Sequence, residues 1–232
     1  MSGPVSYRKD DAIAVITLDD GKVNVLSPST LQEINTALDR AEADGAGAVV
    51  LAGSERVFSG GFDLKVFRSG DVNASIAMLQ AGFNLSHRLL SFPKPVVAAI
   101  TGHAIAMGAF LACSVDHRIA AHSYNFQANE VAIGMVLPYP ALEIMKLRLT
   151  PSAYQQAVGL AKAFFGETAQ AGGWVDEIVL PEQVLPRALE AATEFTTLNA
   201  GAHLASKLRA RQDTLDAMRH GIETIHSEFG LS

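Results

Sequence analysis

Short apolar runs alternate with amphipathic stretches over the first half of the chain. The runs AIAVITL (12–18) and AGAVVLAG (46–53) are typical of buried β-strands, and PSTLQEINTALDRAEAD (28–44) has the spacing of an amphipathic helix. Pro28 and Ser29 suit the first turn of that helix, where a missing proline N–H costs nothing. A strand, a helix and a strand of these lengths predict a parallel βαβ unit.

The alternation continues to about residue 122. FSGGFDLKVF (58–67) has the form of a strand-to-helix turn, and a helical stretch follows at 74–90. PVVAAI (95–100) predicts another strand, a Thr-Gly-His break and a helix of small residues come next, and HRIAAH (117–122) predicts a further strand. These elements indicate the α/β class.

The pattern becomes mainly helical beyond residue 138. Helices are expected in TPSAYQQAVGL (150–160), PEQVLPRALEAATEFTTL (181–198) and ASKLRARQDTLDAMRHGIETIHSEF (205–229). We therefore expect an α/β core over residues 1–180. A helical extension over 181–232 should belong to the same domain and to an oligomer interface.

One segment is long and apolar enough to raise the question of a membrane span. Residues 95–115, PVVAAITGHAIAMGAFLACSV, contain no Asp, Glu, Lys or Arg. The β-branched run, the Thr-Gly-His break and the small-residue run divide it into three pieces. We interpret it as a buried strand, a turn and a helix, and expect no membrane partner.

Composition narrows the classes of function. Of the 232 residues, 49% are hydrophobic and 18% charged, so the chain can bury a large core. Its net charge of −6 argues against a nucleic-acid surface, which needs basic residues against phosphates, but leaves a small anionic ligand open. The single cysteine, Cys113, cannot form an intrachain disulfide, which fits a reducing, cytoplasmic setting. The first residues, MSGPVSYRKDD, have no apolar segment of a secretory signal.

Several common motifs are missing. GAGAVV (45–50) lacks the third glycine of a dinucleotide fingerprint, and neither a phosphate-binding P-loop nor a Gly-x-Ser-x-Gly elbow occurs. His117 and His122 are five residues apart on a predicted strand, so they do not form the helical pair of a zinc site. We expect no bound metal.

Two glycine-containing turns invite a chemical interpretation. Gly60 and Gly61 could serve only a strand-to-helix turn, or they could let bare N–H groups face a ligand oxygen. TGHAIAMGAFLACSVDHRIA (101–120) again turns from a strand into a helix of small residues. Two such turns could direct two backbone N–H groups to one point, which is the geometry of an oxyanion hole.

Three motifs in order resemble the crotonase superfamily, the enoyl-CoA hydratase/isomerase family. They are FSGGFDLKVF, KPVVAAITGHAIAMGAFLACSVDHRIA and FQANEVAIGMVLP. The resemblance covers about residues 12–180. It implies stacked ββα units with a helical C-terminal part (the ClpP/crotonase fold), assembly into trimers or hexamers, and an acyl-CoA thioester as ligand. Coenzyme A would arrive as part of the substrate, with no permanently bound cofactor.

The resemblance also implies site residues. Matched motif to motif, the two oxyanion donors are the N–H groups of Gly60 and Met107. Met107 stands where relatives often have glycine, and a positive φ would strain it. Hydratases of this family use two glutamates to activate water. Here one position falls on Phe110 and the other on Glu130.

A single carboxylate near C2 and C4 of the acyl chain suits a 1,3-proton shift. We therefore expect a 3-enoyl-CoA to 2-enoyl-CoA isomerase of fatty-acid breakdown, similar to the mitochondrial-type 3,2-enoyl-CoA isomerases. Two alternatives remain open: a weak or altered enoyl-CoA hydratase, and a catalytically silent acyl-CoA-binding or scaffold subunit.

The remaining candidates are assigned more simply. Asp63 should cap the helix that follows it, Asp116 and His103 should be structural, and Lys22 and Lys65 are candidates for contacts with CoA phosphates. Substrate contacts are expected from Lys22, Val23, Val25, Ser59, Gly61, Phe62, Asp63, Leu64, Phe110, Asn129 and Leu137.

Overall fold

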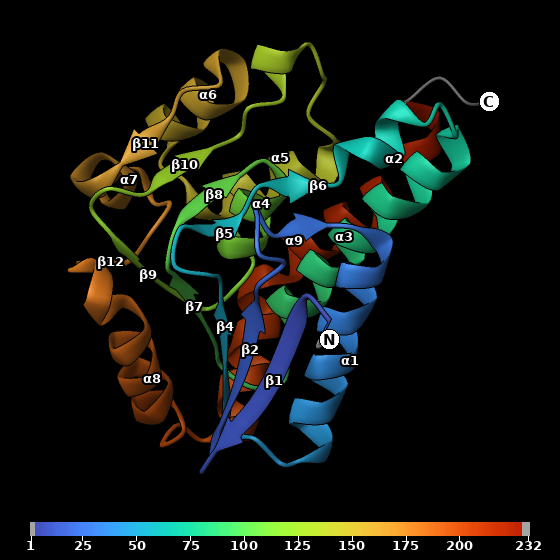
Figure 1. Cartoon of the computed structure of the whole chain (residues 1–232). Helices are drawn as coiled ribbons and strands as arrows, with labels where there is room; N and C mark the ends of the chain where they lie inside the picture. The colour runs from blue at the N-terminus through green and yellow to red at the C-terminus, as the bar shows by residue number, and fades with distance from the viewer. Residues whose placement is uncertain (1–2, 229–232) are drawn as a thin grey trace.

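A six-stranded sheet organises the computed structural model, which describes residues 3–228 (Figure 1). Its strand order is β1-β2-β4-β7-β9-β12, and only β1 is antiparallel to its neighbour. Its strands are β1 (Val5–Asp10), β2 (Ile13–Leu18), β4 (Ala48–Ala52), β7 (Val96–Ile100), β9 (His117–Ala121) and β12 (Glu177–Val179). The predicted strands within residues 12–122 are confirmed, and β2 and β4 pair in parallel as the βαβ prediction requires.

Alternate residues of this sheet pack into two separate cores. On β2, Ile16 faces one core and Val15 the other, and on β4 Val49 and Val50 divide in the same way. Since a strand turns successive side chains to opposite faces, both faces of the sheet must be covered. Helix α8 covers the smaller core, and α1, α3 and α9 contribute to the larger one.

The helices begin where the sequence supplies a cap. Ser27 Oγ accepts the Thr30 N–H at the start of α1, and Asp71 Oδ1 accepts the Ala74 N–H at the start of α3. Asp63 Oδ1 accepts the Lys65 N–H (2.9 Å), which confirms that Asp63 caps α2. The helices are α1 (Pro28–Ala43), α2 (Leu64–Arg68), α3 (Val72–Ser91), α4 (Met107–Cys113), α5 (Tyr139–Arg148), α6 (Pro151–Leu160), α7 (Gly166–Gly172), α8 (Val184–Phe195) and α9 (Ala200–Glu228), with the short helical turns η1 (Val131–Ile133) and η2 (Pro181–Gln183).

Short strands above the main sheet carry the glycine turns. The order β11-β10-β8-β5 forms a second sheet, and β3 pairs in parallel with β6. These strands are β3 (Val25–Leu26), β5 (Val57–Ser59), β6 (Gly61–Phe62), β8 (His103–Ile105), β10 (Asn125–Gln127) and β11 (Phe164–Phe165). The predicted Thr-Gly-His break is wrong in detail, because His103 already begins β8, and its ring accepts the Asn125 N–H.

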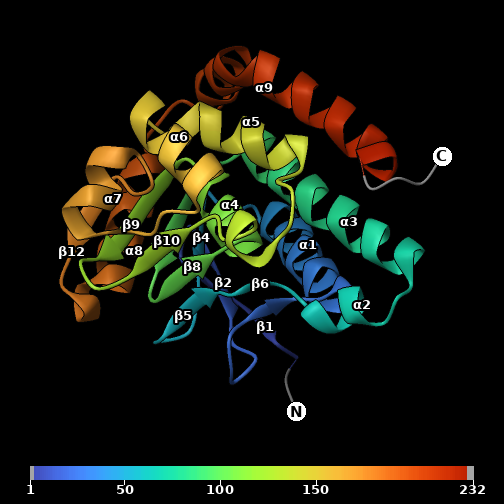
Figure 2. The same cartoon turned by 90° about the horizontal axis from the view of Figure 1, so that it is seen from above.

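The C-terminal helix α9 lies along the outside of α3 and α5 (Figure 2). Its residues Met218 and Ile225 are buried in the larger core. Lys207 and Arg211 form ion pairs with Asp116 at 2.7 and 2.9 Å, and Asp116 also accepts the Val96 N–H. Asp116 is thus structural, as expected: it joins α9 to the end of the sheet.

The apolar segment 95–115 forms β7, β8 and α4, so the predicted strand and helix are present, and the short strand β8 lies where only a turn was predicted. Within residues 3–228, no helix combines the length and apolar character needed to cross a membrane.

Candidate active site

A cavity of about 150 Å³ opens beside the two glycine turns. In another protein, an engineered cavity of about this size binds benzene. The lining residues come from the first glycine turn, α2, α3, the start of α4 and the loop around η1: Gly60, Phe62, Leu64, Phe67, Leu79, Phe83, Ala106, Phe110, Asn129, Glu130, Ile133, Met135, Val136 and Pro138.

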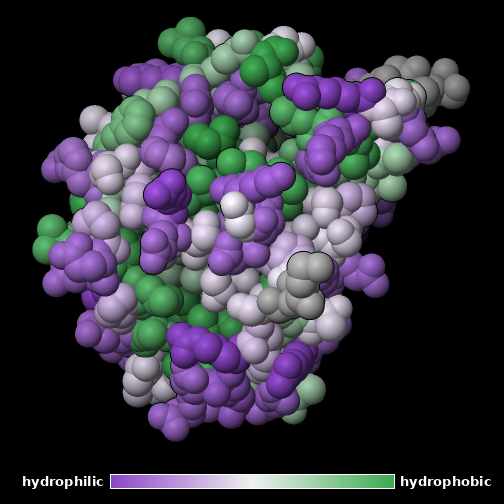
Figure 3. Space-filling model, viewed as in Figure 1, coloured by the Kyte–Doolittle hydropathy of each residue, from purple (hydrophilic) through white to green (hydrophobic). Residues whose placement is uncertain are grey.

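The cavity runs from an exposed mouth to a buried floor. Leu64, Ile133 and Val136 are large apolar residues with exposed side chains at the mouth, and Val136 is 77% exposed. Phe83 and Phe110 are buried on the floor, with rings stacked at 6.4 Å. Figure 3 shows hydrophobic residues reaching the surface in the upper middle of one face. A mouth of this kind accepts an apolar chain from solvent.

Glu130 is the acidic residue of this lining. It is 8% exposed, and its Oε2 is buried without a hydrogen-bond partner within residues 3–228. The carbonyl of Glu130 accepts the N–H groups of Ile133 and Met135, which folds the loop and fixes the start of the side chain. Burial disfavours the charged form and raises the pKa of Glu130 from its ordinary 4.5 to about 7. A carboxylate with these properties can both take and return a proton near neutral pH.

Glu130→Gln is expected to stabilise the protein at pH 8 and much less at pH 5. The folded state holds the Glu130 proton up to about pH 7, whereas the unfolded chain loses it near 4.5, so the free energy of unfolding falls as pH rises between these values. At about 1.4 kcal/mol per pKa unit, ionisation of the buried Glu130 lowers the parent's free energy of unfolding at pH 8 by about 3 kcal/mol. Urea unfolding of the parent and of Glu130→Gln at pH 5 and pH 8 measures this loss. A difference between the two proteins that is the same at both pH values would contradict the raised pKa.

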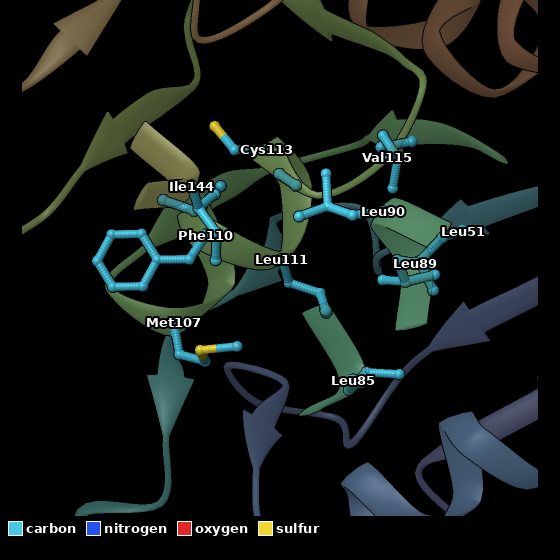
Figure 4. Close-up of a cluster of buried hydrophobic side chains, with 14 of the residues drawn as sticks. Leu51, Leu85, Leu89, Leu90, Met107, Phe110, Leu111, Cys113, Val115 and Ile144 are labelled. Atoms are coloured by element: carbon cyan, nitrogen blue, oxygen red, sulfur yellow. The ribbon is translucent and has the colours of Figure 1, made fainter. Parts of the chain in front are cut away.

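The second glycine turn places strain on Ala106 and not on Met107. Ala106 has φ 50° and ψ −127°, an unfavourable conformation for a residue with a Cβ, and Met107 is the first residue of α4. The Met107 side chain is fully buried in the larger core with other residues of α3 and α4 (Figure 4). Met107 is not among the residues that line the cavity, although its neighbour Ala106 is, and the N–H of a first helical residue has no intrahelical acceptor.

The expected role of Gly60 as a donor is not supported. Its N–H is donated to the Val23 carbonyl (2.8 Å), so it is not free for a thioester oxygen. Gly61 donates to Ser59 Oγ at 3.1 Å and has φ +91°. A Cβ on Gly61 would lie 3.3 Å from the Met107 nitrogen, so this glycine lets the two turns approach each other.

The other predicted site residues divide between the cavity and its support. Phe62, Leu64, Phe110 and Asn129 line the cavity, and the Phe110 ring extends away from the leucines of α3 (Figure 4). The lining does not include Lys22, Val23, Val25, Ser59, Gly61, Asp63, Met107 or Leu137. Val25 pairs with Gly61 between β3 and β6, Ser59 is fully buried, and Leu137 is buried between two lining residues. Ser59 and Leu137 are therefore part of the packing around the cavity, whereas Lys22 and Val23 are exposed.

Three residues of α2 and α3 line the cavity but were not predicted from the sequence: Phe67, Leu79 and Phe83. Phe62 makes edge-to-face contacts with Phe67 (6.1 Å) and Phe83 (6.2 Å). Together with Leu79 they form one wall. Their spacing is that of ordinary core positions, so only the three-dimensional arrangement shows that they face a cavity.

The histidines predicted not to bind zinc have other partners. His117 pairs with Glu177 at 2.8 Å, and His122 with Glu167 at 2.9 Å. Within residues 3–228, no three His, Cys, Asp or Glu side chains gather closely enough to hold a metal ion.

Comparison with known proteins agrees with this arrangement. Residues 8–230 match the family model described as enoyl-CoA hydratase/isomerase. The fold is similar to an enoyl-CoA hydratase of Mycobacterium marinum, at 66% identity over 98% of this chain and 100% of that one, with a TM-score of 0.96. It is equally similar to an enoyl-CoA isomerase of Mycobacterium tuberculosis, at 64% identity over 98% and 100% of the two chains, with a TM-score of 0.96.

A more distant relative gives the same result. A probable enoyl-CoA hydratase of Bacillus subtilis (strain 168) is 30% identical over 194 residues, which are 82% of this chain and 75% of the relative. The family match covers nearly the whole chain, and the fold and the cavity agree with it. The chain therefore belongs to the enoyl-CoA hydratase/isomerase family, the crotonase superfamily of enzymes acting on acyl-CoA thioesters.

Proposed function

We propose that the protein moves the double bond of a 3-enoyl-CoA to the 2-position, with Glu130 as the proton shuttle. The supporting observation is the composition of the cavity: Glu130 is its one acidic residue among those described, and Phe110 stands where a second carboxylate would be needed for hydration. Similar proteins of known structure include both an enoyl-CoA hydratase and an enoyl-CoA isomerase, so the choice between the two reactions rests on the residues of the site.

The reaction needs a base that later acts as an acid. The carboxylate of Glu130 takes a proton from C2, which breaks a C–H bond and leaves a dienolate on the thioester. The same carboxyl group returns the proton to C4, and the double bond moves to C2–C3. A pKa of about 7 suits both steps, because the group is neither too weak as a base nor too weak as an acid.

Two backbone N–H groups would stabilise the enolate oxygen. One is that of Met107, at the start of α4. The other is expected from the first glycine turn, where Gly60 lines the cavity. Phe62 lines the cavity, and Gly61 brings its turn against Met107. Such donors act on charge that develops during the reaction.

Phe110 argues against efficient hydration. Hydration requires a water molecule held by polar groups, whereas the buried part of the cavity lining includes the stacked rings of Phe83 and Phe110. An apolar floor neither orients a water molecule nor supports a second charged group. We therefore expect addition of water to the 2-enoyl product to be slow.

Coenzyme A belongs to the substrate in this proposal, and the reaction needs no resident cofactor. The proton shift is redox-neutral and uses only the carboxyl group and the two N–H donors. Lys22, in the loop before β3, and Lys65, on α2, are our candidates for contacts with the CoA phosphates, because both are exposed cationic residues near the first glycine turn.

Comparing two substrates tests the proposal. The protein is incubated with 3-hexenoyl-CoA and, separately, with crotonyl-CoA, and the products are separated by chromatography. We expect 2-hexenoyl-CoA from the first and little 3-hydroxybutyryl-CoA from the second. Rapid hydration of crotonyl-CoA would indicate a hydratase, and binding of both without turnover would indicate a silent acyl-CoA-binding subunit.

A further inference from the structure

Helix α3 contains a glycine in its middle, at a position that is buried against the rest of the protein. Gly82 is the eleventh of the 20 residues of α3. Glycine in a helix interior is less favourable than alanine, because its backbone loses more conformational freedom on folding. A close contact that a Cβ would prevent can offset this cost.

Gly82 lies on the face of α3 that is turned to the cavity. It follows Leu79 by three residues and precedes Phe83 by one, and both of these neighbours line the cavity. Residues at positions i, i+3 and i+4 share one face of a helix. The missing side chain at Gly82 therefore leaves an opening between Leu79 and Phe83 on this face.

The Phe62 ring occupies this opening. A Cβ added to Gly82 would lie 2.5 Å from both Cε1 and Cζ of Phe62, whereas carbon atoms in contact are about 3.5–4.0 Å apart. The end of the Phe62 ring therefore rests on the bare backbone of α3. Every other residue type has a Cβ, so only glycine leaves the ring in this position.

A side chain at position 82 would push the Phe62 ring toward the cavity. The ring is packed edge-to-face against Phe67 and Phe83, and its open side is the cavity that it lines. The contact distances require a movement of about 1 Å or more. Met107 Cε would be 3.4 Å from the added Cβ, which is ordinary contact, so Phe62 is the residue that must yield. The cavity would become smaller.

We propose that Gly82 sets the size of the acyl-chain cavity by giving the Phe62 ring its place on α3, and that it thereby determines which acyl chains the protein accepts. The inference rests on the proposed function, because it places the acyl chain of the substrate in this cavity. Gly82 does not line the cavity. It acts on the substrate only through Phe62.

The size of the cavity indicates the chain length at which the effect should appear. A cavity of about 150 Å³ matches a ligand of six carbon atoms, so a hexanoyl chain should fill it and a butyryl chain should leave part of it empty. A Phe62 ring displaced into the cavity competes for the space of the last two carbons of the hexanoyl chain. Each buried methylene group contributes about fourfold to affinity.

Calorimetric titration with hexanoyl-CoA and butyryl-CoA measures the effect as the ratio of the two dissociation constants. We expect Gly82→Ala to weaken hexanoyl-CoA binding about tenfold and butyryl-CoA binding less than about threefold. Gly159→Ala is the matched control, because Gly159 is also a helical glycine, on α6, and a Cβ there would have nothing within 4 Å among the described residues. The control should keep the parent's ratio.

A double variant tests whether the effect passes through Phe62. Leucine has no atoms at the positions of Cε1 and Cζ, so Phe62→Leu removes the two atoms that the added Cβ would meet. In this background, Gly82→Ala should change the ratio by less than about twofold. Phe62→Leu alone should enlarge the cavity and raise the affinity for octanoyl-CoA relative to hexanoyl-CoA.

The outcomes distinguish this inference from the isomerase proposal. A folded Gly82→Ala protein with the parent's ratio would overturn the inference, and so would an equal change of the ratio in both backgrounds. If Gly82→Ala does not fold, Phe62→Leu decides: a raised preference for octanoyl-CoA supports the inference, and an unchanged preference overturns it. The ligands are saturated, so their binding does not depend on turnover. If the parent fails to isomerise 3-hexenoyl-CoA but Gly82→Ala still selects against the hexanoyl chain, the inference holds while the isomerase proposal fails.

Discussion

Glu130→Gln is expected to lower the rate of 3-hexenoyl-CoA isomerisation by about 10³-fold or more while acyl-CoA affinity stays close to that of the parent. The amide keeps the size of the side chain, but it cannot accept a proton from C2. General acid–base groups contribute about 10²–10⁴ to rate, and here a single group serves both proton transfers. Steady-state kinetics gives the rate, and calorimetric titration with hexanoyl-CoA gives the affinity.

Glu167→Gln is the matched control for this change. Glu167 lies on α7 beside His122, is exposed, and does not line the cavity. We expect parental kinetics from this control. Turnover by Glu130→Gln within a factor of ten of the parent would remove Glu130 from the mechanism, because no other acidic residue lines the described cavity.

The second large effect is expected from replacing single backbone N–H groups by ester oxygens. Incorporation of the α-hydroxy analogue of methionine at position 107 deletes one donor and leaves the side chain unchanged. We expect this replacement to lower kcat by about 10²–10³-fold, as is typical of the loss of one oxyanion donor. Circular dichroism and thermal unfolding check that each protein is folded.

The same replacement at Gly60 is the control for the assignment of donors. The Gly60 N–H is donated to the Val23 carbonyl, so its loss removes one internal hydrogen bond, at a cost of about 1 kcal/mol of stability. Its effect on kcat should be at most about tenfold. A loss at position 60 as large as the loss at position 107 would return the oxyanion role to Gly60.

Much of the fold could be predicted from the pattern of apolar residues. The strands β2, β4, β7 and β9 are continuous buried runs, which parallel strands covered on both faces require. The short strands β3, β6, β8 and β10 are two or three residues long, too short for any periodicity to appear. β1 was also missed, because its side chains are mostly exposed at the edge of the sheet.

The site was predictable where chemistry depends on residue type and less so where it depends on the backbone. The identity of a side chain at a motif position can be read directly from the sequence. Glu130 and Phe110 were predicted in this way, and both line the cavity. Which N–H of FSGGFDL is free depends on its hydrogen-bond acceptors, and the acceptor of Gly60 is a carbonyl 37 residues earlier in the sequence. No local pattern records that contact.

The strain at Ala106 shows the same limit. The sequence indicated that a positive φ near Met107 would be unfavourable, but the structure places it one residue earlier. Alanine bears the unusual conformation because the Ala106 N–H is donated to the Gln127 carbonyl and its own carbonyl accepts the N–H groups of Ala109 and Phe110. Surrounding hydrogen bonds of this kind are what hold a strained residue in place.

The central claim is that one sheltered carboxyl group carries a proton from C2 to C4, and a labelled version of the substrate incubation tests it most directly. The parent protein is given 3-hexenoyl-CoA deuterated at C2 in ordinary water, and the 2-hexenoyl-CoA product is analysed by mass spectrometry and NMR. Because Glu130 is 8% exposed, its deuteron should exchange slowly, and we predict that a substantial fraction of the transferred deuterium appears at C4. Formation of 3-hydroxyhexanoyl-CoA as the main product, or of 2-hexenoyl-CoA with no deuterium at C4, would contradict the account.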